Sequence, residues 1–373
     1  MMKSVIIVWL SGVVWLSTVL YAGGNVSPPS KKEVIKDTIV VHGMVLHGKV
    51  MDLGSERLSF KLDYAEGINH IKYSDIESIT TRYNYHISYK RIDIEGRVIA
   101  IEDSKYLKVI DSDGHQRTIK IADIDNFIMS IRDDDSFENR VRNKFPYNKG
   151  RIDIGFEIEN GNSQKNKIDI LMNTRYKRAE SEVLFYLDYA YETTQTEDMD
   201  EVLNKDELTS FLTYKYHVTN NDFYFGTIAA EYDKPRHIDA LYVPSVGYGY
   251  RFKFDKSKWL EPSLGVGYAT VAYTDDEYEK KRFSVASINL FGKYQMEDLP
   301  LVKTLITDGF ILYYPSLEDF EKEWIMRANL NFTVPLFDFF SVKLAFDFIN
   351  DSNPDPEVGN NKTTTKLLFG LDF

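Results

Sequence analysis

An alternation of apolar side chains with period two, running to the last residue, constrains this chain most. Apolar residues occupy every second position of the final segment: Leu367, Phe369, Leu371 and Phe373. The positions between them hold Leu368, Gly370 and Asp372. Such a strand has one apolar face and one small or polar face. A transmembrane β-barrel needs this arrangement, because each strand has lipid on one side and the lumen on the other.

The same alternation recurs from Gly150 onward and predicts twelve strands. We place them at residues 150–160, 166–177, 181–192, 207–218, 222–232, 240–254, 258–273, 282–295, 305–316, 323–334, 339–349 and 363–373. Short and long links alternate between these ranges, as they do in barrels with both chain ends on one side. The predicted fold class is therefore all-β, with a transmembrane antiparallel barrel at residues 150–373. A soluble β-sandwich or barrel is the alternative, but it does not account for the aromatic character of the apolar face.

The first 22 residues have the features of a secretory signal peptide. Lys3 precedes an uncharged apolar stretch from Val5 to Leu20, and we expect cleavage after Ala22. An uncleaved membrane anchor is the alternative. The full chain is 27% charged, which excludes a bundle of transmembrane helices. The absence of cysteine excludes a lipid-anchoring cysteine, disulfides and thiolate metal sites. A net charge of −12 argues against a nucleic-acid partner.

An ungapped internal repeat with an offset of 48 positions precedes the predicted barrel. Gly48 corresponds to Gly96, and the motif Asp75-Ile76-Glu77 corresponds to Asp123-Ile124-Asp125. Each copy alternates with period two, so we expect two curled antiparallel sheets that pack together, because one copy is too small to bury a core. The predicted organisation is a polar linker at 23–37, a small barrel-like β-domain of two repeats at 38–132, and a linker at 133–149.

The motif Asp111-Ser112-Asp113-Gly114 resembles the start of a calcium loop. The later ligands and the closing glutamate of such a loop are missing, so we interpret the motif as an Asp-Gly turn. We therefore expect no metal and no cofactor.

Charged residues occupy the predicted inner face of the barrel strands. The candidate lumen-lining residues are Asp188, Lys215, Arg251, Arg327, Lys343 and Asp347. They either pair with one another in a filled interior, since buried charges must be paired, or line a narrow pore that selects solutes. We expect no enzyme, because Ser210 and His217 lie seven residues apart and face opposite sides of one strand.

Several motifs of the barrel region resemble those of the YdiY-like family, proteins described as salt-stress-induced outer-membrane proteins with a domain of unknown function. They are Gly247-Tyr248-Gly249-Tyr250-Arg251-Phe252, Leu264-Gly265-Val266-Gly267-Tyr268, Pro315-Ser316-Leu317-Glu318-Asp319, Phe339 to Phe348 with Asn350, and Leu371-Asp372-Phe373. The resemblance implies an outer-membrane location and a link to osmotic or salt stress. Some members also carry a small β-domain before the barrel. The family supplies no catalytic residues.

These features predict an outer-membrane barrel with its small domain in the periplasm. The expected partners are the lipid bilayer of the outer membrane, the outer-membrane assembly machinery and a periplasmic protein. Phe373 is the candidate assembly signal. The expected role is a structural or anchoring barrel with a periplasmic interaction domain, and a narrow polar channel for small solutes or ions is the alternative.

Overall fold

A computed structural model describes residues 36–372, apart from 55, 66–67, 131–139, 141–142, 160–162, 197–201, 256, 275–280, 298, 301, 303, 337–339 and 353–360. The predicted signal peptide, the tether up to residue 35 and Phe373 lie outside the described residues. Within the described ranges, no helix has the length and apolar character needed to cross a membrane.

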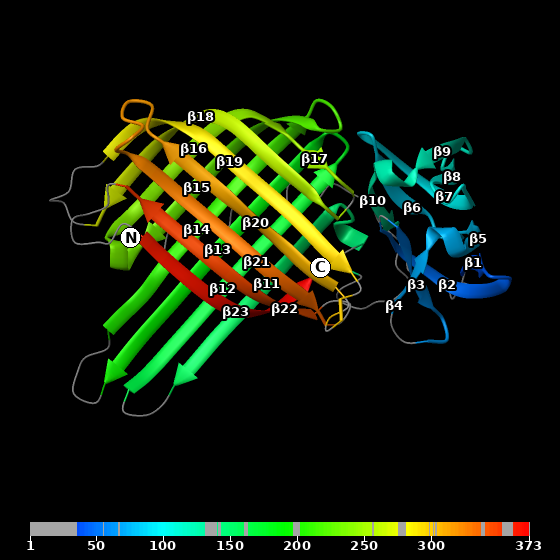
Figure 1. Ribbon diagram of the computed structural model, residues 1–373, viewed down its shortest axis with the longest axis horizontal. Helices are drawn as coiled ribbons and strands as arrows, with labels where there is room; N and C mark the ends of the chain where they lie inside the picture. The colour runs from blue at the N-terminus through cyan, green and yellow to red at the C-terminus, as the bar shows by residue number, and fades with distance from the viewer. Residues whose placement is uncertain are drawn as a thin grey trace, which may run out of the picture. The chain divides into compact units, whose positions relative to one another are not determined.

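The N-terminal part consists of two small antiparallel sheets with identical topology (Figure 1). The first contains β1 (Asp37–Val41), β2 (Met44–Leu53), β3 (Arg57–Leu62), β4 (Ile68–Lys72), the 3-10 turn η1 (Tyr73–Asp75) and β5 (Ile76–Thr80). The second contains β6 (Tyr85–Tyr89), β7 (Ile92–Glu102), β8 (Tyr106–Asp111), β9 (Gln116–Lys120), η2 (Ile121–Asp123) and β10 (Ile124–Met129). The strand orders β5-β1-β2-β3-β4 and β10-β6-β7-β8-β9 correspond position by position. The internal repeat is therefore a structural repeat.

A β-bulge at the same place in each copy explains why the sheets curl. The pairing register shifts after Val50 in β2 and after Val98 in β7, which are 48 positions apart. A bulge bends its strand and increases the local twist. The curled sheets bury one common core, in which the rings of Tyr85 and Phe127 stack at 4.2 Å. The two copies thus pack together, as the repeat predicts.

A buried carboxylate links the two copies. Asp37 begins β1 rather than belonging to the tether, and its side chain is fully buried. It accepts hydrogen bonds from the Tyr85 hydroxyl at 2.5 Å and from the backbone N–H groups of Val50 and Arg82 at 2.9 and 2.8 Å. Burial raises the pKa of Asp37, and these donors oppose that increase. Because Tyr85 belongs to the second copy, this carboxylate stabilises their pairing.

We expect Asp37→Asn to destabilise the repeat domain by about 1–3 kcal/mol. The substitution replaces one acceptor oxygen with an NH2 group, which would point at a backbone N–H and leave both donors without an acceptor. In the wild type, a raised pKa means that the folded state holds its proton more tightly than the unfolded state. The stability of the repeat domain should therefore fall as pH rises from 3.8 to the raised value, and be flat above it. Hydrogen exchange of the full-length protein measures both effects. Equal protection of β1 and β6 in the variant and wild type would contradict this role of Asp37.

Twelve long antiparallel strands form the second part of the described chain. They are β11 (Asn148–Glu159), β12 (Ser163–Arg178), β13 (Ser181–Thr196), β14 (Val202–His217), β15 (Asp222–Asp233), β16 (Ile238–Tyr250), β18 (Trp259–Tyr273), β19 (Lys281–Glu297), β20 (Thr304–Pro315), β21 (Trp324–Pro335), β22 (Phe340–Asp351) and β23 (Asn361–Asp372). The two-residue β17 (Phe252–Lys253) follows β16, and the 3-10 turn η3 (Lys234–Arg236) follows β15. Each strand pairs with its neighbours in chain order, and β11 pairs with β23, so the sheet closes on itself. The predicted twelve-stranded barrel is confirmed.

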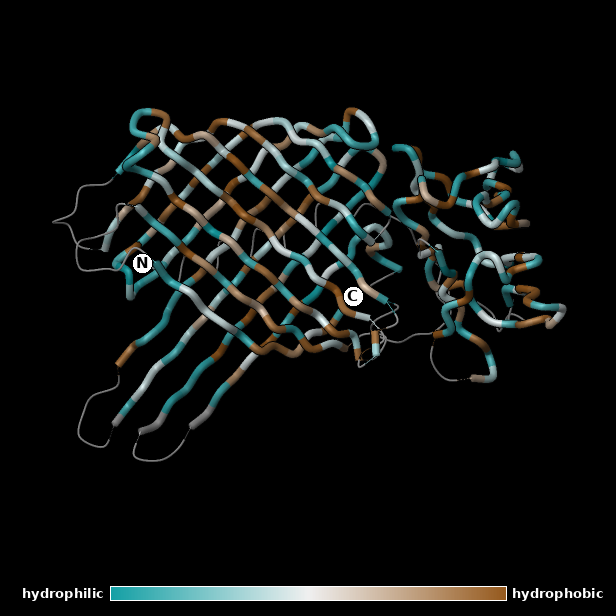
Figure 2. Tube along the Cα trace, in the orientation of Figure 1, coloured by the Kyte–Doolittle hydropathy of each residue, from teal (hydrophilic) through white to brown (hydrophobic). Residues whose placement is uncertain are grey.

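Apolar and polar residues alternate along these strands, as Figure 2 shows. Several strand boundaries differ from expectation, most of all at the link predicted between Thr193 and Asp206. There β13 and β14 extend into the predicted loop and stay paired as far as Thr194 and Val202. We call the rim that holds the start of β11 and the end of β23 the terminal rim, and the opposite rim the distal rim.

Candidate functional site

A buried network of charges lies inside the barrel near the terminal rim, with Glu182 of β13 at its centre. This carboxylate accepts a hydrogen bond from Arg175 Nε at 2.8 Å and one from an Arg251 guanidinium nitrogen at 3.1 Å. The Nε2 atom of His217 lies 2.8 Å from Glu182 Oε2. Glu182 is 1% exposed, so its charge is balanced by these neighbours rather than by water.

A second carboxylate, Glu261 of β18, extends this network. Lys215 Nζ donates to Glu261 at 2.5 Å, and Arg251 Nε donates to the other oxygen of the same group. The ammonium group of Lys215 also lies 4.8 Å from the ring centre of Phe223 and 5.1 Å from that of Phe291. Lys215 and Arg251 are thus enclosed by carboxylates and aromatic rings.

The wall formed by β11, β22 and β23 carries two further groups of ion pairs. Lys343 Nζ lies 2.6 Å from Asp153 Oδ2, and Arg151 lies 2.6 Å from the other oxygen of that carboxylate. Lys366 Nζ lies 2.7 Å from both oxygens of Asp188 and 3.3 Å from Asp347.

Towards the distal rim, Glu231 of β15 pairs with two arginines. Arg327 Nε donates to it at 2.5 Å, and Arg236 NH1 donates at 3.2 Å. Lys362 of β23 forms ion pairs with Glu207 and Asp233 on the opposite side of the interior.

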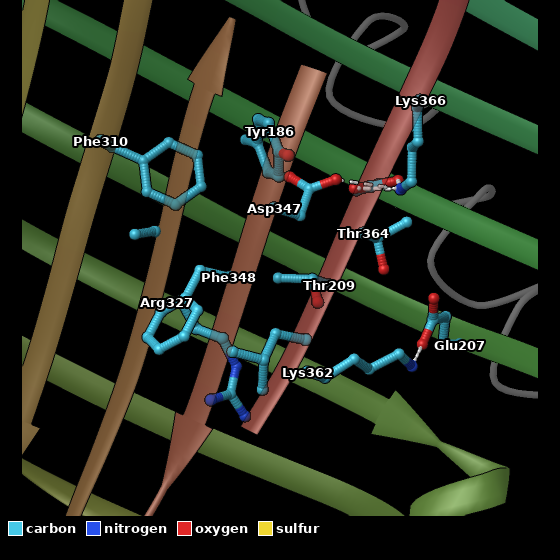
Figure 3. A pocket seen from close by; sticks show the side chains of 13 residues that line it. Tyr186, Glu207, Thr209, Phe310, Arg327, Asp347, Phe348, Lys362, Thr364 and Lys366 are labelled. Atoms are coloured by element: carbon cyan, nitrogen blue, oxygen red, sulfur yellow. Dashed lines mark hydrogen bonds and ion pairs between the residues drawn. The ribbon is translucent and has the colours of Figure 1, made fainter. Parts of the chain in front are cut away.

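An aromatic cluster fills the middle of the barrel. Tyr186 and Phe211 stack at 5.0 Å, and Phe310 meets both rings edge-on at 5.0 and 5.2 Å. Phe291 lies 5.9 Å from Phe211. A cavity of about 40 Å³ remains between this cluster and the pairs around Lys366 and Lys362 (Figure 3). It has room for a few water molecules.

The structure places the six candidate lumen-lining residues inside the barrel and gives each an oppositely charged partner. Five of them are at least nine-tenths buried: Asp188, Lys215, Arg251, Arg327 and Lys343. Asp347, the sixth, is 15% exposed and pairs with Lys366. The partner carboxylates were missed in the sequence: Asp153, Glu182, Glu231 and Glu261. Each of them occupies one of the alternate strand positions that face inward. The period-two pattern of the sequence could therefore have identified them as inner-face residues.

The Asp111 turn matches its interpretation from the sequence. The carboxylate of Asp111 accepts hydrogen bonds from Arg117 Nε and from the His115 backbone N–H, both at 2.8 Å. Gly114 has a φ of +85°, which suits a tight turn. Both oxygens of Asp111 thus accept hydrogen bonds within the turn, and Asp111, Asp113 and His115 offer ligand atoms within 4.8 Å of one another.

Comparisons with known proteins concern the barrel. The family model described as "Protein of unknown function, DUF481" matches residues 152–373. Among solved structures, the chain is similar to the NanC porin at 10% identity and a TM-score of 0.34, over 60% of this chain and 98% of that one. It is also similar to the β-domain of the Bordetella autotransporter BrkA, at 8% identity and a TM-score of 0.30, over 61% and 98% of the two chains. The chain is also similar to the translocator domain of the autotransporter NalP from Neisseria meningitidis. The identity is 9% and the TM-score 0.32, over 61% of this chain and 86% of that one. No curated protein matches the chain.

Proposed function

We infer that this protein is an anchoring barrel of the outer membrane. The premise is that the chain belongs to the DUF481 family of proteins of unknown function. In this proposal the barrel spans the bilayer and holds the repeat domain at the periplasmic surface. The repeat domain binds a periplasmic protein there. We assign no catalytic role, and the link to salt stress belongs to the same proposal.

The outer face of the barrel supports the membrane location. Large apolar side chains are exposed on neighbouring strands: Tyr214, Tyr224, Val246, Tyr248, Leu264, Val266, Tyr268, Leu367, Phe369 and Leu371. A continuous apolar surface of this kind is unfavourable in water and is favourable against lipid. The repeat domain precedes β11, so we place the terminal rim at the periplasmic surface. Phe373, beyond the described residues, stays our proposed signal for the assembly machinery.

The filled interior is the observation that favours an anchor over a channel. The charged side chains described above are paired with one another, and the aromatic cluster occupies the space between the opposite walls. A channel for ions needs wall charges that face water along a continuous path. The cavity of about 40 Å³ beside Lys366 is too small to form such a path.

A narrow polar channel remains the second candidate because of one row of side chains on β20, β21 and β22. Asn331 donates to Asp308 and to Asn329, at 2.9 and 2.5 Å, and Asn329 donates to Asp347 at 2.6 Å. A hydrogen-bonded polar row along one wall is the lining that small solutes would need.

Conductance in planar bilayers tests the anchor proposal. We expect the full-length protein to insert, as judged by heat-modifiable migration of liposome-bound protein on a gel, and to give no stepwise currents. The aromatic cluster predicts the positive control. A Phe211→Ala/Phe310→Ala variant removes two of its rings and should conduct if it folds. Wild-type currents whose preference shifts towards anions in Asp347→Asn would refute the anchor and support the channel.

A further inference from the structure

One face of the second repeat sheet is covered by other residues of the chain. On this face Ser88 of β6 pairs with Asp93 of β7 and with Asn126 of β10. Ser88 and Asn126 are 3% and 7% exposed. Asp93 lies 3.4 Å from Arg178, at the end of β12. We call the surface formed by Ser88, Asp93, Asp125 and Asn126 the docked face.

The docked face meets residues of the barrel strands through polar contacts. Asn126 donates a hydrogen bond to the backbone oxygen of Lys177 at 3.0 Å. Beside it, the carboxylate of Asp125 lies 3.1 Å from Lys177 Nζ and 2.8 Å from Lys253 Nζ. The carboxylate of this face in the second copy therefore meets two ammonium groups.

The first copy leaves the same face exposed. The repeat offset of 48 positions relates Val40, Val45 and Ser78 to the three paired residues of the docked face, and these residues pair in the same way. Val45 is 56% exposed, and the adjacent Met44 is 60% exposed. Ser78 is exposed as well. We call the surface formed by Val40, Met44, Val45, Glu77 and Ser78 the open face.

The open face has an apolar centre where the docked face is polar. Ser88 donates a hydrogen bond to Asp93 at 2.5 Å, so the docked face presents a hydroxyl and a carboxylate there. Val40 and Val45 replace this pair in the first copy and present only methyl groups. An apolar centre with polar groups around it is the usual composition of a protein–protein interface.

Glu77 gives the open face an acidic group beside this centre. It occupies the position of Asp125, is exposed, and accepts a hydrogen bond from the Gly43 N–H at 3.0 Å. That contact places the carboxylate at the β1–β2 turn, next to Met44. Among the described residues, Glu77 forms no ion pair. Since Asp125 takes two lysines on the docked face, complementary charge favours a partner that brings a lysine to Glu77.

We propose that the open face of the first repeat binds the periplasmic partner, and that this partner presents an apolar segment flanked by a lysine. The apolar segment packs on Val40 and Val45, and the ammonium group reaches Glu77. The second repeat thus contacts the chain's own barrel, while the first contacts another protein. This inference rests on the proposed function, because it requires the repeat domain to lie in the periplasm.

Cross-linking with a water-soluble carbodiimide in whole cells tests the open face in the full-length protein. The reagent joins a carboxylate to an ammonium group with which it is in contact, and peptide mass spectrometry locates the amide bond. We expect Glu77 to be joined to a lysine of another envelope protein. The link between Asp125 and Lys253 is the internal positive control. Glu77 left unlinked beside a formed control link would overturn the proposal, and so would a link from Glu77 to a second copy of this chain.

A substitution that the repeat itself offers tests the apolar centre. Val45→Asp gives the first copy the residue that the second copy carries, so the sheet should still fold. The new charge has no partner in an apolar contact and should lower the yield of the Glu77 link about tenfold. Tyr64→Asp, the matched control, adds the same charge at a 70% exposed side chain outside the open face and should leave the yield unchanged. Equal yields in the two variants would refute the apolar centre.

Two outcomes distinguish this inference from the observations on which it depends. Protein found outside the outer-membrane fraction contradicts the proposed function. Outer-membrane protein that forms the link between Asp125 and Lys253 but none at Glu77 contradicts the open face alone. If the link between Asp125 and Lys253 is itself missing, the docked face is wrong and the comparison between the two copies fails with it.

Discussion

Replacing Lys343 with glutamate should destabilise the barrel by about 3–5 kcal/mol, the largest effect that we expect from a single charge reversal. Lys343 is 1% exposed, and its ammonium group lies 2.6 Å from Asp153. A glutamate there would bring a second buried carboxylate against Asp153, with only Arg151 to balance the two. Urea unfolding of the barrel in liposomes, followed by tryptophan fluorescence, measures the loss. Heat-modifiable migration on a gel shows whether the variant assembles.

Two controls separate charge from packing at this position. Lys343→Met/Asp153→Leu removes one ammonium group and one carboxylate together. It leaves Arg151 with the Asp372 carboxylate at 3.8 Å and brings no two carboxylates against each other, so it should be more stable than Lys343→Glu. Lys322→Glu reverses a charge on a side chain that is 81% exposed and should change stability by less than about 0.5 kcal/mol. If Lys343→Glu were as stable as Lys322→Glu, the paired interior would be wrong and the channel would become the better reading of this wall.

Gly247→Ala should cost about 3 kcal/mol, the upper range for overpacking a tight core. A methyl group at Gly247 would lie 2.3 Å from the backbone oxygen of Leu264 and 2.6 Å from Gly265 Cα, so the strands β16 and β18 would have to separate. A methyl group would also lie 2.7 Å from the ring of Phe225. The first glycine of the motif that begins at Gly247 is thus required by close contact between neighbouring strands.

Gly226 is the matched control for this substitution. It lies on the adjacent strand β15 and pairs with Val246, and the nearest atom to an added methyl group is 3.9 Å away. Gly226→Ala should therefore be neutral or slightly stabilising, since alanine restricts the unfolded chain more than glycine does. The same urea titration compares the two variants. Similar stabilities would show that the β16–β18 contact is not tight.

Much of the barrel could be predicted from the sequence, because the alternation that defines each strand and its two faces lies within that strand's own residues. The alternation at Val342, Leu344 and Phe346 shows which side chains of β22 share a face, and closure of the sheet then puts the opposite face inside. The repeat offset of 48 positions predicted the paired sheets for the same reason, since each copy contains all its own strands. Where boundaries differed, as between β13 and β14, cross-strand pairing extended the strands into residues whose composition suggested a loop.

The partners of the inner charges could not be predicted in the same way. Glu182 meets Arg251 69 positions later, and Lys366 meets Asp188 178 positions earlier. Parity places each of these residues on the inner face, but it does not say which residues lie at the same depth. Depth depends on strand tilt and register around the closed sheet.

The sequence by itself therefore determined the strands, the face on which each side chain lies and the duplication of the N-terminal sheet, because these follow from the two-residue period and from repetition along the chain. The tertiary structure alone decided that the charges pair, that the aromatic rings of Tyr186, Phe211 and Phe310 meet, and that β11 and β23 share only four paired positions. Each of these depends on the registers of all the strands together. A change of register at one strand pair moves the residues of every following strand to another depth in the barrel. The depth of a residue therefore depends on all the registers together, which no short segment of the sequence specifies.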